Sequence, residues 1–150
     1  MWLDALFAYL HYTAIFLLFA FLVVQLILVR GPLDLRTVRL LGRMDIWYFS
    51  SAGAALATGF LRATLGAKGP DFYFNAWPIY AKIALFLAVG IISVKPTLTF
   101  IQWRRAFEKD AAWQVPADEQ ARIRRLIMIE VHLAALIPVF AVIMARGLGR

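Results

Sequence analysis

The sequence predicts an all-α fold, an integral membrane four-helix bundle whose N-terminus and C-terminus both lie outside, on the periplasmic face. Three observations lead to this prediction. Hydrophobic residues make up 63% of the chain, whereas soluble domains contain about 45–50%. These residues fall into four runs, and arginines gather in alternate connections between the runs. At 150 residues, the chain is expected to form one transmembrane domain, with spans over residues 5–29, 45–63, 78–99 and 124–146.

The first span is the most apolar of the four. It is interrupted only by His11, Thr13 and Gln25, and at about 1.5 Å per residue it is long enough to cross about 30 Å of hydrocarbon. A signal peptide is the alternative for this stretch. Asp4 in place of a basic cluster, and the lack of a small-residue cleavage site, favour a retained helix.

The second span is less apolar and carries a ridge of small residues at every fourth position. This ridge consists of Ser51, Ala55, Gly59 and Ala63. Small residues at this spacing allow another helix backbone to approach closely. The ridge therefore predicts a helix-packing surface, either within the chain or toward another protein.

The other two spans are marked by prolines and by the connections around them. Aromatic residues within 64–78 favour a loop at the lipid–water boundary. The third span is predicted to start near Pro78 and to be kinked at Pro96. Pro116, followed by Asp118 and Glu119, predicts a helix start just before the fourth span, because acidic residues in a first turn favour the helix dipole.

The distribution of basic residues predicts the orientation in the membrane. The net charge is +7, and ten of the sixteen Lys and Arg residues lie in the first and third connections: Arg30, Arg36, Arg39, Arg43, Arg104, Arg105, Lys109, Arg122, Arg124 and Arg125. Cytoplasmic connections carry such an excess. We therefore expect a multi-pass protein of a bacterial inner membrane that contacts the lipid bilayer and does not bind nucleic acid.

Four ionisable residues within the predicted spans call for a partner or a function, namely His11, Lys82, Glu130 and His132. Each charged group near the centre of a bilayer costs roughly 2.5–3.5 kcal/mol on insertion scales. Counting the rise per residue puts His11 and Lys82 at a comparable depth in the outer half, where they can share one site. Glu130 and His132 fall in the inner half, about 200° apart around the helix, so both cannot face the bundle centre.

Each of these residues also has a structural explanation. His11 can be a satisfied polar core group, and Lys82 can extend toward the outer interface. Glu130 is open to two roles, an ion pair with Arg43 or Arg125, or proton handling. Because the chain has no cysteine, disulfides, thiolate metal sites and cysteine nucleophiles are excluded. Nothing resembles a nucleotide-binding glycine loop, a hydrolase nucleophile elbow or a zinc HExxH motif.

The order of the polar residues resembles the haem-binding, four-helix protoporphyrinogen oxidase family of the HemJ type. Three segments carry the likeness: Tyr9-Leu10-His11, the run from Trp77 to Leu85 that contains Lys82, and the run from Arg125 to His132 that contains Glu130. Weaker agreement surrounds Gly42 and Gly59. The chain departs from the family pattern at Ile129, where the family has Asn, and at His132, where it has Pro. These features predict a sister family of bacterial membrane proteins of unknown function.

The resemblance implies that His11 is an axial ligand of haem b, that Lys82 lies close to the cofactor and that Glu130 lies in the bundle. Neutral imidazole is a standard haem ligand, and Lys82 could pair with a propionate. His132 is a candidate second ligand, although the helix rise puts it roughly 10 Å deeper than His11.

The leading functional prediction is a haem b membrane protein with a redox role, and an oxidoreductase if it is an enzyme. Its substrate would be a porphyrinogen-like compound, or it would pass electrons between quinone and a partner. The alternative is a non-catalytic scaffold or assembly factor that acts through helix contacts, and we expect a homo-oligomer. A channel or transporter is disfavoured because no paired carboxylates are evident in the spans.

Overall fold

The computed structural model describes residues 2–66 and 69–148 and is all-α, as predicted. Four long helices and one short helix follow each other along the chain: α1 (Trp2–Arg30), α2 (Leu35–Leu65), α3 (Gly69–Phe74), α4 (Trp77–Lys109) and α5 (Ala117–Ala145). Lys68 and Arg150, which enter the prediction of orientation, lie outside the described residues.

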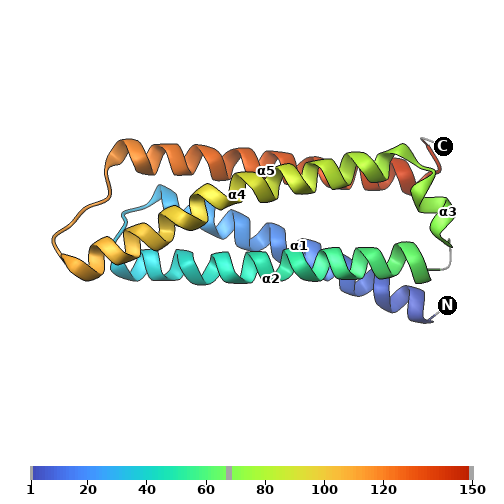
Figure 1. Cartoon of the computed structure of the whole chain (residues 1–150), viewed down its shortest axis with the longest axis horizontal. Helices are drawn as coiled ribbons and strands as arrows, with labels where there is room; N and C mark the ends of the chain where they lie inside the picture. The colour runs from blue at the N-terminus through green and yellow to red at the C-terminus, as the bar shows by residue number, and fades with distance from the viewer. Residues whose placement is uncertain (1, 67–68, 149–150) are drawn as a thin grey trace.

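The long helices form two antiparallel hairpins that lie side by side (Figure 1). One hairpin is α1 with α2 and the other is α4 with α5, and α1 also contacts α5 while α2 contacts α4. The start of α1 and the end of α5 lie at one end of the bundle together with α3 (Figure 1), and we call this the terminal end. The α1–α2 and α4–α5 connections lie at the opposite end, which we call the loop end.

Three of the four long helices are long and apolar enough to cross a membrane, namely α1, α4 and α5. The remaining long helix, α2, has 31 residues but is less apolar. Its first three turns carry Arg36, Arg39 and Arg43, and Asp45 follows. By length and composition, three of the four predicted spans are therefore supported.

The apolar core lies between the two hairpins. Leu22 and Val29 of α1, Leu41 of α2, Trp103 of α4 and Ile127 of α5 are almost completely buried there. The exposed face of the same helices is also apolar, as expected where lipid replaces water. At the loop end, the Gln120 side chain donates hydrogen bonds of 2.9 Å to the carbonyls of Val29 and Gly31, which ties α5 to the end of α1.

Two helices are longer than the sequence predicts. The second long helix, α2, begins at Leu35 instead of residue 45. The third long helix, α4, continues to Lys109 instead of residue 99. Both extensions are rich in arginine. A prediction based on hydropathy ends a span at such residues, although the helix continues through them. α5 begins at Ala117, directly after Pro116 as predicted.

The connection over residues 64–78 is partly helical rather than a simple loop. It contains α3, and Tyr73 of this helix packs with Ala63, Ala76 and Met144 in a second, smaller apolar cluster at the terminal end. The chain enters α3 at Gly69, whose φ of 73° is favourable for glycine. In α4, Pro96 lies inside the helix, and α4 changes direction along its course (Figure 1).

Asp34 provides a testable local contact, because it caps the start of α2. Its carboxylate accepts a 2.7 Å hydrogen bond from the Thr37 backbone N–H, and the hydrogen bonds from Thr37 hold the pKa of Asp34 below its usual value. We expect Asp34→Ala to lower the free energy of unfolding, because it removes the acceptor of the cap. Asp34→Asn should retain most of it, since an amide oxygen also accepts. The cap should weaken as the pH falls through the lowered pKa, where the carboxylate is lost.

The free energy of unfolding is measured in mixed micelles by circular dichroism, at one pH above and one pH below the lowered pKa of Asp34. If Asp34→Asn destabilises the protein as much as Asp34→Ala, the loss does not come from the cap.

Candidate functional site

The imidazole of His11 is held by α2 in one orientation. Its Nδ1 lies 3.0 Å from the backbone carbonyl oxygen of Ala55 and 3.2 Å from the hydroxyl oxygen of Thr58. A carbonyl can only accept, so Nδ1 must carry the hydrogen and donate it to Ala55. In the neutral ring the lone pair therefore belongs to Nε2, the nitrogen that remains available to a ligand.

Gly59 makes room for this imidazole. A Cβ atom at Gly59 would lie 3.0 Å from Cε1 of His11, closer than most real contacts. Ser51, Ala55 and Ala63, the other residues of the small-residue ridge, are buried. The ridge thus packs within the chain, where Ala55 and Gly59 face α1. The central part of the ridge is covered by α1 of the same chain.

Two basic side chains accompany His11 near the terminal end, Arg62 from α2 and Lys82 from α4. The charges of both act on His11, as expected if His11 and Lys82 share a depth. The Arg62 guanidinium lies 5.2 Å from the centre of the Tyr12 ring, and its Nε is buried without a hydrogen-bond partner. Within residues 2–66 and 69–148, neither Arg62 nor Lys82 forms an ion pair. We call His11, Arg62 and Lys82 the cationic cluster.

The helices that carry His11 and Lys82 do not pack directly on each other. In the described part of the chain, no Cα atom of α1 lies within 8 Å of a Cα atom of α4. The cationic cluster therefore brings together side chains from separate hairpins, with Arg62 on the helix that contacts both α1 and α4.

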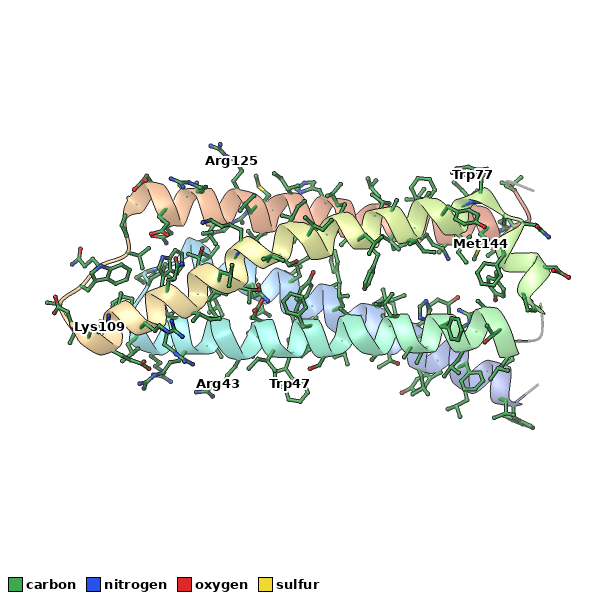
Figure 2. The ribbon with its side chains drawn as sticks, viewed as in Figure 1. Arg43, Trp47, Trp77, Lys109, Arg125 and Met144 are labelled. Atoms are coloured by element: carbon green, nitrogen blue, oxygen red, sulfur yellow. The ribbon has the colours of Figure 1, made fainter. Side chains whose placement is uncertain are left out.

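Glu130 lies in a second polar group at the centre of the bundle, where only 1% of its surface is exposed. Its Oε2 is 2.7 Å from the Ser93 hydroxyl oxygen, which in turn is 2.9 Å from the Tyr48 hydroxyl oxygen. The ion pair predicted as one alternative is wrong, because Arg43 and Arg125 point away from the bundle (Figure 2). The rotation of α5 that turns Glu130 inward leaves Arg125 exposed, and Arg43 is exposed on α2.

Asp45 belongs to the same region and is missed by the sequence analysis, which places it at the mouth of the second span. It is 7% exposed, and the side chains of Thr97 and Gln25 face it. The signal that could have found it is Asp34, three residues before Thr37. A helix capped at Asp34 has Asp45 three turns inside it, and not at its start.

His132 lies on the outer face of α5, apart from the other predicted site residues. Its side chain is exposed, and its Nδ1 donates to the Met128 carbonyl of its own helix at 2.6 Å. The opposite orientations of Glu130 and His132 agree with the 200° separation expected from their spacing. The structure does not bring His132 together with His11.

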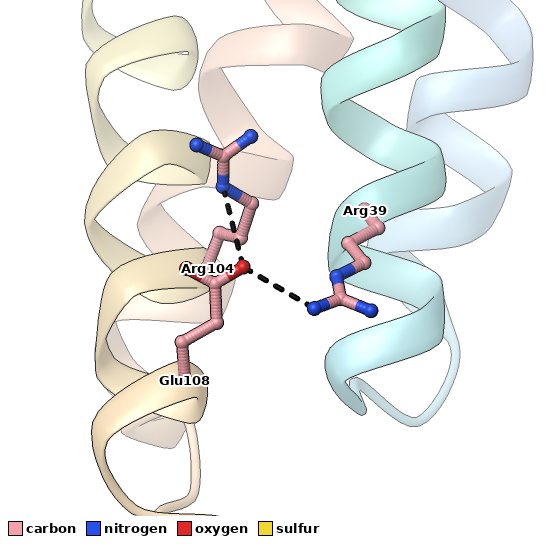
Figure 3. Close-up of polar contacts among 3 residues, drawn as sticks. All are labelled: Arg39, Arg104 and Glu108. Atoms are coloured by element: carbon pink, nitrogen blue, oxygen red, sulfur yellow. Dashed lines mark hydrogen bonds and ion pairs between the residues drawn. The ribbon is translucent and has the colours of Figure 1, made fainter.

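A cleft of about 600 Å³ opens between α2 and α4 toward the loop end. Arg39, Arg43, Arg104 and Arg105 line it together with Glu108, and Asp45 and Thr97 also form part of its wall. Glu108 bridges the two helices, since its Oε1 lies 3.3 Å from Arg39 and 3.8 Å from Arg104 (Figure 3). The cleft therefore connects the arginine-rich end with one of the two buried carboxyl groups.

The fit of His11 against Gly59 can be tested with a matched pair of substitutions. Gly53 lies on the same helix, but a Cβ atom there would meet nothing within 4 Å. We expect Gly53→Ala to raise the free energy of unfolding by roughly 0.5–1 kcal/mol, because alanine loses less backbone entropy in a helix. Gly59→Ala should gain less, since its Cβ displaces the imidazole. Equal gains in a denaturant titration of the two variants would contradict the contact.

Comparison with known proteins identifies a family for almost the whole chain. A family described as Predicted membrane protein (DUF2214) matches residues 3–149. No curated protein and no solved structure matches the sequence. Taken with three helices apolar enough to cross a bilayer, the match shows that this chain belongs to the predicted membrane protein family DUF2214.

Proposed function

We propose that this protein binds haem b through His11 and serves in membrane electron transfer. The observation that carries the proposal is the fixed hydrogen bond from Nδ1 of His11 to the Ala55 carbonyl. Histidines that ligate metals usually donate their other ring N–H to a carbonyl or carboxylate, which sets the tautomer and the ring orientation. His11 has this arrangement, with Nε2 as its remaining donor atom to iron.

A single histidine suits haem better than a bare metal ion. In the described residues, no three His, Asp or Glu side chains are grouped so that they could hold a metal ion. The porphyrin itself supplies the equatorial nitrogens, so the protein needs to provide only axial ligands. His11 would be one such ligand. His132 faces outward and is left out of the proposed site.

The cationic cluster supports the same cofactor. Haem carries two propionates, and carboxylates in a dry environment need charge-assisted hydrogen bonds. Arg62 has a buried Nε without a partner, and Lys82 lies near His11 without an ion pair among the described residues. Both would hold propionates. This gives the two half-buried cations a counter-charge that no described residue supplies.

The proposed topology has four spans with both termini outside, in a bacterial inner membrane. α2 would complete the set of four spans, as the second span in chain order, because it is 31 residues long and lies along α1 (Figure 1). The loop end carries Arg39, Arg43, Arg104 and Arg105. Under the positive-inside rule this end is cytoplasmic, so the cationic cluster belongs to the outer half of the membrane.

When bound, haem b would supply a one-electron redox centre. The chain's own contributions are the orientation of the imidazole by Ala55, the counter-charges on Arg62 and Lys82, and the apolar helices that exclude water. The motif order that resembles the HemJ-type family supports this class of function. The electrons would come from a porphyrinogen-like substrate, or they would pass between quinone and a partner. We expect the protein to be a homo-oligomer.

The proposal predicts a Soret absorption band in the protein purified in detergent from cells supplied with haem. His11→Ala should abolish the band, because it removes the donor atom. His132→Ala is the matched control and should keep the band, since His132 faces outward. A colourless wild-type protein would overturn haem binding, and a band unchanged in His11→Ala would overturn the ligand assignment.

The counter-charge role predicts a weaker affinity for haem in Arg62→Gln and in Lys82→Gln. Each hydrogen bond to a charged group contributes about 1.5–3 kcal/mol, so each variant should bind haem about tenfold more weakly or worse. Lys95→Gln is the control, because Lys95 lies on α4 with an exposed side chain. Titration of the apoprotein with haem gives the dissociation constants, and equal values for Lys82→Gln and Lys95→Gln would contradict the propionate contact.

A further inference from the structure

The central polar group contains more short oxygen contacts than its hydroxyl hydrogens can fill. Ser93 Oγ lies 2.9 Å from the Tyr48 hydroxyl, 2.8 Å from the Val89 carbonyl oxygen and 2.7 Å from Glu130 Oε2. Each contact needs one hydrogen between its two oxygens. Tyr48 and Ser93 have one hydroxyl hydrogen each, and Val89 can only accept. The third hydrogen can come only from the carboxyl group of Glu130.

The surroundings of Glu130 also disfavour its charged form. Its second oxygen, Oε1, is buried without a hydrogen-bond partner. The groups that face Glu130 or Asp45 from the neighbouring helices are Tyr48 on α2, Ser93 and Thr97 on α4, and Gln25 on α1. Arg39, Arg43, Arg104 and Arg105 line the cleft on which Asp45 lies, but none of them forms an ion pair with Asp45 or Glu130 in the described residues. The charge of Asp45 itself acts on Glu130. Two ionised carboxylates in such a dry interior would repel each other without compensation.

Asp45 connects this interior to the loop end. Asp45 and Thr97 line the cleft between α2 and α4, whereas Glu130, Ser93 and Tyr48 do not. Asp45 and Tyr48 lie three residues apart on α2, so they occupy neighbouring positions on one face of the helix. The arginines at the mouth of the cleft are charged and need hydration, which favours water in its outer part.

We propose that Glu130 holds a proton inside the bundle and exchanges it with the loop end through Asp45 and the α2–α4 cleft. The ligand of this site is the proton itself. In the exchange, an ionised Glu130 takes the hydrogen of Ser93, Ser93 takes that of Tyr48, and Tyr48 takes that of a protonated Asp45. Each O–H bond breaks as the next forms. Tyr48 and Ser93 end neutral, and Asp45 ends ionised. A hydronium ion that reaches the cleft from the solution at the loop end then reprotonates Asp45 and leaves water. This proposal does not depend on haem binding.

Infrared spectroscopy of the full chain in lipid nanodiscs at neutral pH tests the protonated state. We expect a carbonyl stretching band of a protonated carboxylic acid, which is lost in Glu130→Gln and shifted in Ser93→Ala. The Ser93 variant keeps every carboxyl group, so it reports on Glu130 even if Glu130→Gln fails to fold. A wild-type spectrum without this band would overturn the proposal, and so would a band that neither substitution changes.

The route is tested by the rate at which this band shifts after transfer to deuterated water. Asp45→Asn should slow the exchange about tenfold or more, because a positioned carboxyl group typically accelerates proton transfer at least that much. Gly42→Phe should also slow it, since Gly42 lines the cleft and a Cβ there meets nothing within 4 Å. Gly53→Phe is the matched control on the exposed face of α2 and should exchange like the wild type.

Exchange that is equally fast in the wild type, Asp45→Asn and Gly42→Phe would overturn the route through Asp45. Slowing in Gly42→Phe and Asp45→Asn, but not in Gly53→Phe, would support it.

Discussion

A polar group inside a bilayer has no bulk water to satisfy it, so it must find its partners within the protein or carry a large free-energy cost. This constraint organises the whole bundle. Most of the interior is apolar and includes Leu22, Trp103 and Ile127. Its polar side chains are concentrated in two groups, one around His11 near the terminal end and one around Glu130 and Ser93 at the centre. Each group draws side chains from both hairpins, and the hydrogen bonds of the central group join the hairpins through Tyr48, Ser93 and Glu130.

The two polar groups differ in the charge that they leave unbalanced. The cationic cluster has Arg62 and Lys82 without an ion pair among the described residues. The central group has two carboxyl groups, and neither forms an ion pair within the described chain. An excess of positive charge calls for a bound anion, whereas an excess of carboxyl groups calls for a bound proton. This opposition is the physical reason to assign a cofactor's carboxylates to one group and proton exchange to the other.

Much of the fold can be predicted from the sequence, because apolar runs and start signals are local properties. α1 and the beginning of α5 lie where the sequence puts them. The start of α2 is misjudged by ten residues, since Arg36, Arg39 and Arg43 resemble a polar connection. The rotation per residue of a helix also predicts that Glu130 and His132 point to opposite sides of α5. The register between helices determines that His11 contacts Ala55, and it determines the partners of Glu130. No local sequence pattern encodes this register. Asp45 and Arg62 are missed because charges near the ends of spans resemble topology signals.

The composition of α2 has a consequence for how the chain enters the membrane. A helix with three arginines, an aspartate and many small residues gains little by partitioning into hydrocarbon alone. α1, by contrast, is the most apolar helix of the chain and lies along α2 (Figure 1). We therefore expect the α1–α2 hairpin, and not the single helix, to be the unit of insertion during biogenesis. In that order of events, α1 promotes the insertion of α2 into the membrane.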